Sequence, residues 1–344
     1  MHLLNHSRIQ RLPAAALPIG LLALLLPWCG CQTPTTRSGV PRADLTLEQR
    51  AVDLLLRAAR SEDPELASNA IEALVQVAPE QGLPFFRAAL AAESPLARFA
   101  GLVALGSLRE CASPGGYRAH LNDTSPMVRL AAAYALWRCG DTTQAALLVN
   151  ALNGHPDENV RAEAAHLIGL LDEPRAVKRL RYAGRIRANE RAPKVLVQIY
   201  TALGRLGDTE AVRRLIDYTQ GTSAMRLLAL QGLAELGAEE ARSALRYRAG
   251  PDEDYLVHRL IAARGLAKLG SNVGYDLALR STRFVGKNPE DPAETMRVRA
   301  NAALTLGEIG DRRALPALER LAADGQDARV QVAACYAICR IVQR

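Results

Sequence analysis

The amino-acid sequence predicts an all-α protein, an α-solenoid of about nine two-helix repeats, because one segment recurs at a nearly constant spacing. Residues 157–172 have sister copies at 125–140 and 295–310. Successive copies end 31, 31, 32, 35, 30, 33, 40 and 32 residues apart. The positions that end the copies are Ala78, Arg109, Gly140, Asp172, Gly207, Gly237, Gly270, Gly310 and Val342. A period of this length holds two short helices and two turns.

Each repeat is predicted to contain a longer second helix and a shorter first helix. In residues 157–172, apolar residues follow the spacing of one buried helical stripe. This stripe contains Val160, Ala164, Leu167, Ile168 and Leu171. The first helices are entered through an aspartate, whose side chain is able to cap exposed backbone N–H groups. The aspartates at this entry are Asp141, Asp208 and Asp311.

Composition favours one continuous solenoid over several compact domains. Aromatic residues make up only 4% of the 344 residues, and no break in composition divides the chain. The first unit begins at Leu45, and as a terminal cap we expect it to carry a polar outer face. Glu48, Gln49, Arg50 and Asp53 would form that face. The formal net charge is +7, with acids and bases interleaved, which argues against a nucleic-acid partner.

The repeated segment resembles the HEAT repeat, and in particular the short HEAT-like type first associated with phycobilisome lyases. The resemblance covers residues 45–344 and rests on Val-Arg at the start of the second helix, Ala-Ala in its middle and Gly-Asp after it. Six units keep the arginine: Arg98, Arg129, Arg161, Arg226, Arg259 and Arg299. We interpret this series as ion-pairing between repeats rather than ligand contact, interrupted at Ala67, Leu196 and Gln331. Tetratricopeptide repeats fit less well, because their large aromatic positions do not recur here.

The N-terminal residues read as an export signal followed by a tether. Residues 1–31 contain a short basic region and then an apolar run at 12–26, which is shorter than the roughly 20 residues of a membrane span. The end of this segment resembles a bacterial lipoprotein signal, with Gly30 before an acceptor Cys31. Ordinary signal-peptidase cleavage is the alternative. The resemblance implies an outer-membrane lipoprotein facing the periplasm or cell surface, held by lipid through a flexible tether at 32–44.

No residue pattern in the sequence predicts a metal, a cofactor or a catalytic centre. The chain lacks a Cys-x-x-Cys pair and the repeated His-Glu pairs of deoxyhypusine hydroxylase, a HEAT-repeat enzyme. Cys335 and Cys339 lie one turn apart on a predicted helix, where core packing competes with a strained disulfide. Cys111 and Cys139 lie near the ends of neighbouring second helices, where stacking of the two repeats would bring their thiols close enough for a disulfide.

A binding surface is the remaining candidate site. In HEAT-like solenoids the second helices line the concave face. Side chains of these helices that lie off the apolar stripe should therefore point into it. The candidate binding residues are Tyr134, Trp137, Arg138, His166, Arg205, Arg264 and Lys268. Tyr and Arg are favoured at interfaces, although an ordinary solvated helix face is the alternative interpretation.

The sequence therefore predicts a non-catalytic protein-binding scaffold, with an acidic segment of another protein as its guest. The competing hypothesis is a lyase-like or maturation factor that handles a small molecule, or its acceptor protein, in the concave groove. Buried groups with shifted pKa values in the groove would favour the competitor, and open, solvated charge would favour the scaffold.

Overall fold

The computed structural model describes residues 42–112, 114–287 and 292–344, and this part of the chain contains helices and turns but no strand. The predicted α-solenoid of HEAT-like repeats is confirmed, and its helices form nine pairs. The first helices are α1 (Arg42–Ala58), α3 (Pro79–Ala89), α5 (Pro114–Ala119), α7 (Ala145–Gly154), α9 (Ala176–Ala183), α12 (Thr209–Tyr218), α14 (Arg242–Ala249), α16 (Tyr275–Ser281) and α18 (Leu315–Ala323). The second helices are α2 (Pro64–Val77), α4 (Pro95–Ser107), α6 (Pro126–Arg138), α8 (Glu158–Leu170), α11 (Pro193–Arg205), α13 (Ser223–Leu236), α15 (Leu256–Lys268), α17 (Ala293–Ile309) and α19 (Ala328–Val342). A single turn, α10 (Arg187–Glu190), links α9 to α11.

The expected signal segment, Cys31 and most of the expected tether lie outside the described residues. The first described helix begins at Arg42, three residues before the start that the sequence predicts for the solenoid. Within the described part of the chain, no helix is both long enough and apolar enough to span a bilayer.

The repeated position that ends each unit is explained by the way the second helices stop. Seven of these positions have a positive φ, and five of the seven are glycines, such as Gly140 at 91° and Gly310 at 79°. The left-handed conformation closes a helix C-terminus, and glycine adopts it without steric cost from a Cβ. Arg109 (φ 52°) and Asp172 (φ 55°) adopt the same conformation with a side chain present.

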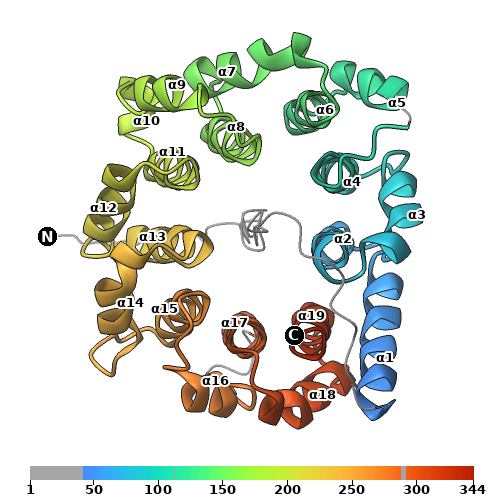
Figure 1. Cartoon of the computed structure of the whole chain (residues 1–344), viewed down its shortest axis with the longest axis vertical. Helices are drawn as coiled ribbons and strands as arrows, with labels where there is room; N and C mark the ends of the chain where they lie inside the picture. Colours follow the sequence, from blue (N-terminus) through green and yellow to red (C-terminus); the bar gives the residue numbers. More distant parts are fainter. Residues whose placement is uncertain (1–41, 113, 288–291) are drawn as a thin grey trace, which may run out of the picture.

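The nine pairs form two concentric layers (Figure 1). The second helices stand inside and are seen nearly end-on, whereas the first helices surround them. Apolar residues between the layers form the core, in one large cluster that includes the first and last units and a smaller one built from residues of α11 to α15. The inner helices therefore present their opposite face to the centre of the molecule.

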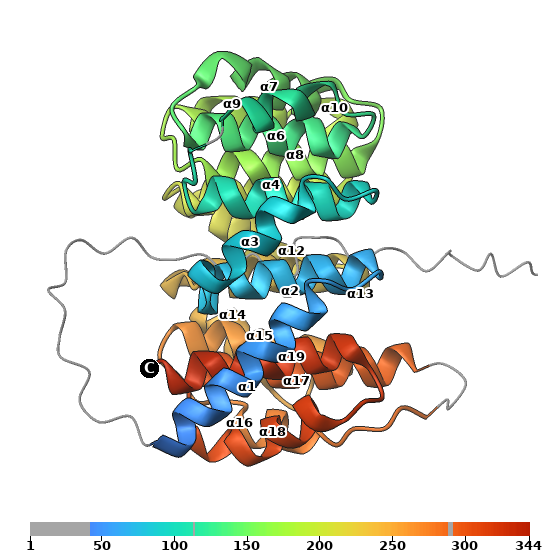
Figure 2. The same cartoon turned by 90° about the vertical axis from the view of Figure 1, so that its right-hand side faces the viewer.

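The solenoid closes into a ring, because the last unit packs against the first. The Tyr336 hydroxyl of α19 donates to Gln76 Oε1 of α2 at 3.0 Å, and Gln343 Nε2 donates to the Val77 carbonyl at 2.8 Å. An ion pair between Arg50 and Glu319 at 2.5 Å joins α1 to α18. Figure 2 shows α1 lying across α19.

The expectation that the first unit is a solvent-facing cap is therefore wrong in part. Leu55 and Val52 of α1 are buried in the same core as α19. Glu48 and Arg50, which the sequence assigns to a polar outer face, bond to the last unit instead. Because the two terminal units cover each other's apolar faces, the ring needs no cap.

Of the six arginines predicted to connect neighbouring units, Arg98, Arg161, Arg226 and Arg299 do so, whereas the Nε of Arg259 is buried without a hydrogen-bond partner. Ion pairs from one unit to the loop of the next are Arg98–Asp123 at 2.8 Å, Arg226–Glu253 at 3.1 Å and Arg299–Asp324 at 3.1 Å. Arg161 makes the equivalent contact with a neutral partner, Asn189 Oδ1, at 2.8 Å. Arg129 differs, because it donates to the Asp123 carbonyl of its own unit.

The four described cysteines behave in two ways. Cys111 and Cys139 form a disulfide, with Cα atoms 5.5 Å apart, that ties the end of α4 to the end of α6. Cys335 and Cys339 are free and buried in α19, which confirms core packing for this pair.

Candidate functional site

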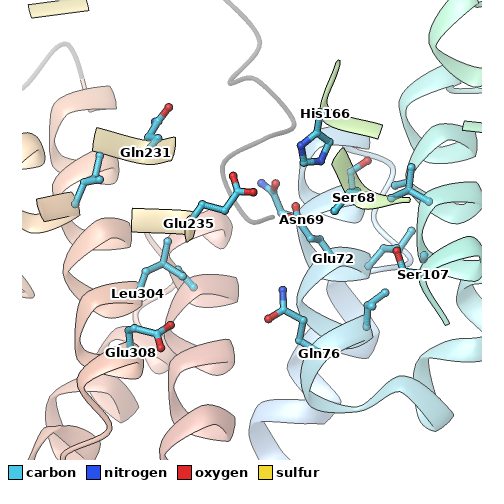
Figure 3. Close-up of a pocket in the computed structure, with 18 of the residues that line it drawn as sticks. Ser68, Asn69, Glu72, Gln76, Ser107, His166, Gln231, Glu235, Leu304 and Glu308 are labelled. Carbon is cyan, nitrogen blue, oxygen red and sulfur yellow. The ribbon is translucent and has the colours of Figure 1, made fainter. Parts of the chain in front are cut away.

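The ring encloses a central cavity of about 1190 Å³ that all nine second helices line. Figure 3 shows side chains from α2, α4 and α8 on one side of this space and from α13 and α17 on the other. Nine lining residues share one repeat offset, near the ends of the helices: Gln76, Ser107, Arg138, Leu170, Arg205, Glu235, Lys268, Glu308 and Arg340. The predicted concave face is thus the wall of the cavity at the centre of the ring.

Several basic side chains of this wall bind the C-terminal carbonyls of neighbouring inner helices. Arg138 donates to the Leu170 carbonyl at 3.3 Å, and Lys268 donates to the Glu235 carbonyl at 2.6 Å. These carbonyls lack partners within their own helices and lie at the negative end of the helix dipole. Burial lowers the pKa of Lys268 to about 8. Both side chains therefore stabilise the ring.

Other basic side chains of the wall are paired with acids. Arg205 pairs with Glu235, and burial lowers the pKa of this arginine to about 9. Glu308 accepts from Arg340 at 3.3 Å and from Arg344 at 3.1 Å. The basic stripe that the sequence predicts is thus compensated from within the protein, which weakens the argument for an acidic guest.

Three of the predicted binding residues are not solvated side chains of the cavity. Tyr134 lines the cavity but is only 1% exposed, with its hydroxyl 3.1 Å from Ser107 Oγ, so it belongs to the packed wall. Arg264 is buried and does not line the cavity. Trp137 is partly buried and does not line it either. The expectation of an open helix face is wrong here, because ring closure packs the inner helices tightly side by side.

Two polar side chains of α8 that line the cavity each carry a buried atom without a hydrogen-bond partner. Glu163 and His166 are 8% and 7% exposed, and neither Glu163 Oε1 nor His166 Nδ1 has a hydrogen-bond partner. Burial raises the pKa of Glu163 to about 7 and lowers that of His166 to about 3. Burial and the negative charge of Glu163 also raise the pKa of Glu72 on α2. The structure thus leaves buried hydrogen-bond acceptors at one side of the cavity.

Glu163 is a site candidate that the sequence analysis misses. It lies two positions after Arg161, at an offset where other repeats carry small apolar residues such as Ala100 and Ala131. Asn301 is polar at the same offset, and its Oδ1 is also buried without a partner. Asn69 and Gln198 are polar at this offset too, so polarity at this position alone did not single out Glu163.

The wall of the cavity holds buried polar atoms without hydrogen-bond partners, both acceptors and donors. Among the described residues, no group of three or more His, Cys, Asp or Glu side chains has the arrangement of a metal site. The buried atoms without a hydrogen-bond partner in cavity-lining residues include acceptors on Glu163, His166, Glu235 and Asn301, and also donors, namely Nε of Arg138 and the three guanidinium nitrogens of Arg205, whose ion pair with Glu235 makes no hydrogen bond. A carboxyl group with a pKa near 7 exchanges its proton readily at neutral pH.

Fold and cavity together define a class, a closed α-solenoid around a central cavity. The model of the HEAT repeats family matches two segments of the chain, residues 117–185 and 290–339. None of the curated proteins compared with the chain matches it.

Solved structures with a similar arrangement include two helical-repeat proteins. Human deoxyhypusine hydroxylase in complex with glycerol is 21% identical, with 79% of this chain and 99% of that chain covered and a TM-score of 0.38. The complex of CpcE and CpcF of phycocyanin lyase from Nostoc sp. PCC7120 is 20% identical, with 80% and 98% covered and a TM-score of 0.41. At these values the similarity says nothing about the function of this chain.

Proposed function

We propose that this protein is a non-catalytic binding ring that holds a segment of a partner protein in its central cavity. The observation that carries the proposal is the pair of buried, unpartnered polar atoms, Glu163 Oε1 and His166 Nδ1, at a cavity of about 1190 Å³. A buried polar group without a partner costs about 1–3 kcal/mol. A guest that donates hydrogen bonds would remove this cost.

The size and extent of the cavity support a protein segment as the guest. Pockets for small molecules typically measure roughly 300–1,000 Å³, and this cavity is larger. Its lining runs from Glu65, in the first turn of α2, to Arg344 at the end of the chain. A guest that contacts both ends of the inner helices must itself be extended.

A residue inside the cavity and one outside it provide a matched test. Gln231 lines the cavity, whereas Arg213 of α12 is exposed on the outer layer. We expect a photo-crosslinking amino acid at position 231, but not at 213, to capture a discrete protein in the native envelope. Asn69→Trp, which fills cavity space from α2, should abolish this capture. Capture from position 213 alone would contradict the proposal.

We further infer that the protein acts in the cell envelope, anchored by lipid on Cys31. The export signal in residues 1–31 supports this location, as does the Cys111–Cys139 disulfide, a bond that persists in oxidising compartments. Cys31→Ser should move the protein from the membrane fraction to the soluble fraction. A mutant that still needs detergent for extraction would contradict anchoring by lipid.

A second candidate function, handling of a small molecule, is favoured by one observation. Glu163 and Lys268, with pKa values of about 7 and about 8, line the same cavity, and buried groups with shifted pKa values cluster at sites of ligand chemistry. Mass spectrometry of the protein under native conditions tests this candidate. A small molecule that co-purifies with the wild type and is lost in Asn69→Trp would favour it over the protein guest.

A further inference from the structure

We propose that a second pocket, between the outer helices α14 and α16, binds the carboxylate of an acidic side chain that another protein presents between apolar residues. The pocket has a volume of about 500 Å³ and lies where the unit of α14 and α15 meets the unit of α16 and α17 (Figure 1). Its lining residues are Ala249, Arg259, residues 272–277 and Arg313, and none of them lines the central cavity. This surface is therefore separate from the cavity on which the proposed function rests.

Arg259 carries the proposal, because within the described part of the chain it is the one repeated arginine whose side chain makes neither a hydrogen bond nor an ion pair. The other five donate to groups of their own unit or of the next one. Of the three guanidinium nitrogens of Arg259 only Nε is buried without a partner, so Nη1 and Nη2 remain accessible on a side chain that lines the pocket. A partly buried charge without a partner is costly. The pocket therefore favours a ligand that accepts hydrogen bonds and carries negative charge.

The sequence explains why Arg259 lacks the partner that its counterparts have. In three other units the arginine pairs with a carboxylate 25 or 27 residues later, in the loop of the next unit: Arg98–Asp123, Arg226–Glu253 and Arg299–Asp324. In a fourth unit the partner is an amide 28 residues later. The residues 25 to 28 positions after Arg259 have no carboxylate or amide side chain, since they are Phe284, Val285, Gly286 and Lys287. A carboxylate from another molecule would complete the contact that the repeat makes elsewhere.

Arg313 supplies a second cation at the same pocket. Its Nε and Nη2 donate to Asp311, and its Cζ lies 5.2 Å from the centre of the Tyr275 ring, so the side chain is held beside the pocket. Asp276 also lines the pocket and adds one negative charge. A singly charged carboxylate therefore fits better than a phosphate group, whose roughly two charges would meet Asp276 with no third cation among the lining residues.

Exposed apolar side chains concentrate in the two units that form this pocket. Five large apolar side chains are exposed in the described residues, and four of them belong to these units: Tyr247, Tyr255, Val273 and Val285. Val273 lines the pocket itself, and Tyr255 lies one turn before Arg259 on the same face of α15. Tyrosine and arginine are enriched at protein interfaces. The ligand is therefore an acidic residue with apolar neighbours in the sequence of a partner protein.

The test is a calorimetric titration of the purified full-length chain with two capped tripeptides, acetyl-Leu-Glu-Leu-amide and acetyl-Leu-Gln-Leu-amide. We expect the glutamate probe to bind about tenfold more tightly, because only a carboxylate forms charge-assisted hydrogen bonds with Arg259. Arg259→Gln should abolish this preference at an unchanged melting temperature, since the side chain has no partner to lose. Arg280→Gln is the matched control: it removes an exposed arginine of α16 that does not line the pocket, and it should preserve the preference.

Two further variants separate the apolar contact and the central cavity from the charge. Val273→Ser should weaken the binding of both probes alike, because it removes apolar contact at the pocket and leaves the charge unchanged. Asn69→Trp, which fills the central cavity, should change the binding of neither probe. Failure of the proposed function in the crosslinking experiment is thus distinguishable from failure of this pocket.

Equal binding of the two probes by the wild type would overturn the proposal, as would a preference that survives Arg259→Gln or is lost equally in Arg280→Gln. Tighter binding of acetyl-Leu-phosphoserine-Leu-amide than of the glutamate probe would overturn the choice of a carboxylate. If Arg259→Gln does not fold, Asn272→Glu decides. This change adds a carboxylate at an exposed position of the pocket, so it should compete for Arg259, repel the acidic probe and remove the preference. A preference that persists in Asn272→Glu would contradict the proposal.

Discussion

The α8 side and the α17–α19 side of the cavity both carry buried ionisable groups, but the two sides differ in how these groups are paired. Glu308 of α17 accepts from two arginines of the last unit, and Tyr336 of α19 is bonded to Gln76 across the closing contact. Glu163 Oε1 and His166 Nδ1 of α8 are buried without a hydrogen-bond partner. Polar side chains of the inner helices thus have hydrogen-bond partners in one part of the cavity wall and lack them in another.

This difference teaches that repeat offset alone does not distinguish structure from function. Charged residues along the inner helices satisfy helix ends and neighbouring units wherever a partner is within reach, as Lys268 does with the Glu235 carbonyl. A functional residue is better recognised by the absence of such a partner in a buried position. Substitutions at paired residues of the wall, such as Glu308, and at the unpaired Glu163 separate the two cases.

The largest effect is expected from Tyr134→Ala in the wall. This side chain is only 1% exposed and packs among the inner helices, so its removal should lower the free energy of unfolding by about 3–5 kcal/mol in a denaturant titration. Tyr134→Phe, which keeps the ring and removes only the hydroxyl contact with Ser107, should cost about 1 kcal/mol. A Tyr134→Ala protein as stable as the wild type would show that the inner face is open after all.

Glu308→Gln is expected to destabilise the protein by about 1–3 kcal/mol, because the change leaves Arg340 and Arg344 without their shared carboxylate. Chemical denaturation at neutral pH measures this effect. Glu319→Gln is the matched control, since its ion pair with Arg50 is solvent-exposed and should contribute less than about 1 kcal/mol. Equal effects of the two changes would mean that the Glu308 pairs are no stronger than a surface contact.

A smaller effect is expected from Tyr336→Phe at the closing contact. The variant loses one hydrogen bond, to Gln76, and should be less stable by about 1 kcal/mol. Tyr182→Phe, at a side chain that is 65% exposed, should leave the melting temperature unchanged. If both variants melt like the wild type, this hydrogen bond does not contribute to ring closure.

The unit boundaries and the helix types could be predicted from the sequence, because apolar period and helix termination are local properties. Seven of the nine positions predicted to end the units are where the chain turns left-handed, including Arg109 and Asp172, which no glycine marks. The inter-repeat role of Arg98 and Arg226 also followed from their offset.

Closure could not be predicted, because it depends on small rotations between repeats that add up over the whole chain. Without closure, Tyr134 looked like a side chain of an open face, and Glu48 and Arg50 looked like parts of a cap. Glu163 was missed for a related reason, since a glutamate on a predicted helix is ordinarily solvated. Only the ring places it in a buried wall, with its pKa raised to about 7.

The most direct test compares the free energy of unfolding of Glu163→Gln with that of the wild type between about pH 4 and about pH 8. It shows whether the carboxyl group of Glu163 is unpaired, unlike that of Glu308. In the folded protein the pKa of Glu163 is raised from 4.5 to about 7, so folding favours the protonated carboxyl group. The wild type should therefore match the variant below about pH 4.5 and lose stability relative to it as the pH rises to about 7. At about pH 8 the account predicts that Glu163→Gln is the more stable protein, by on the order of 1 kcal/mol or more. A variant that is less stable than the wild type at every pH would contradict the account, because Glu163 would then be a paired residue of the wall, as Glu308 is.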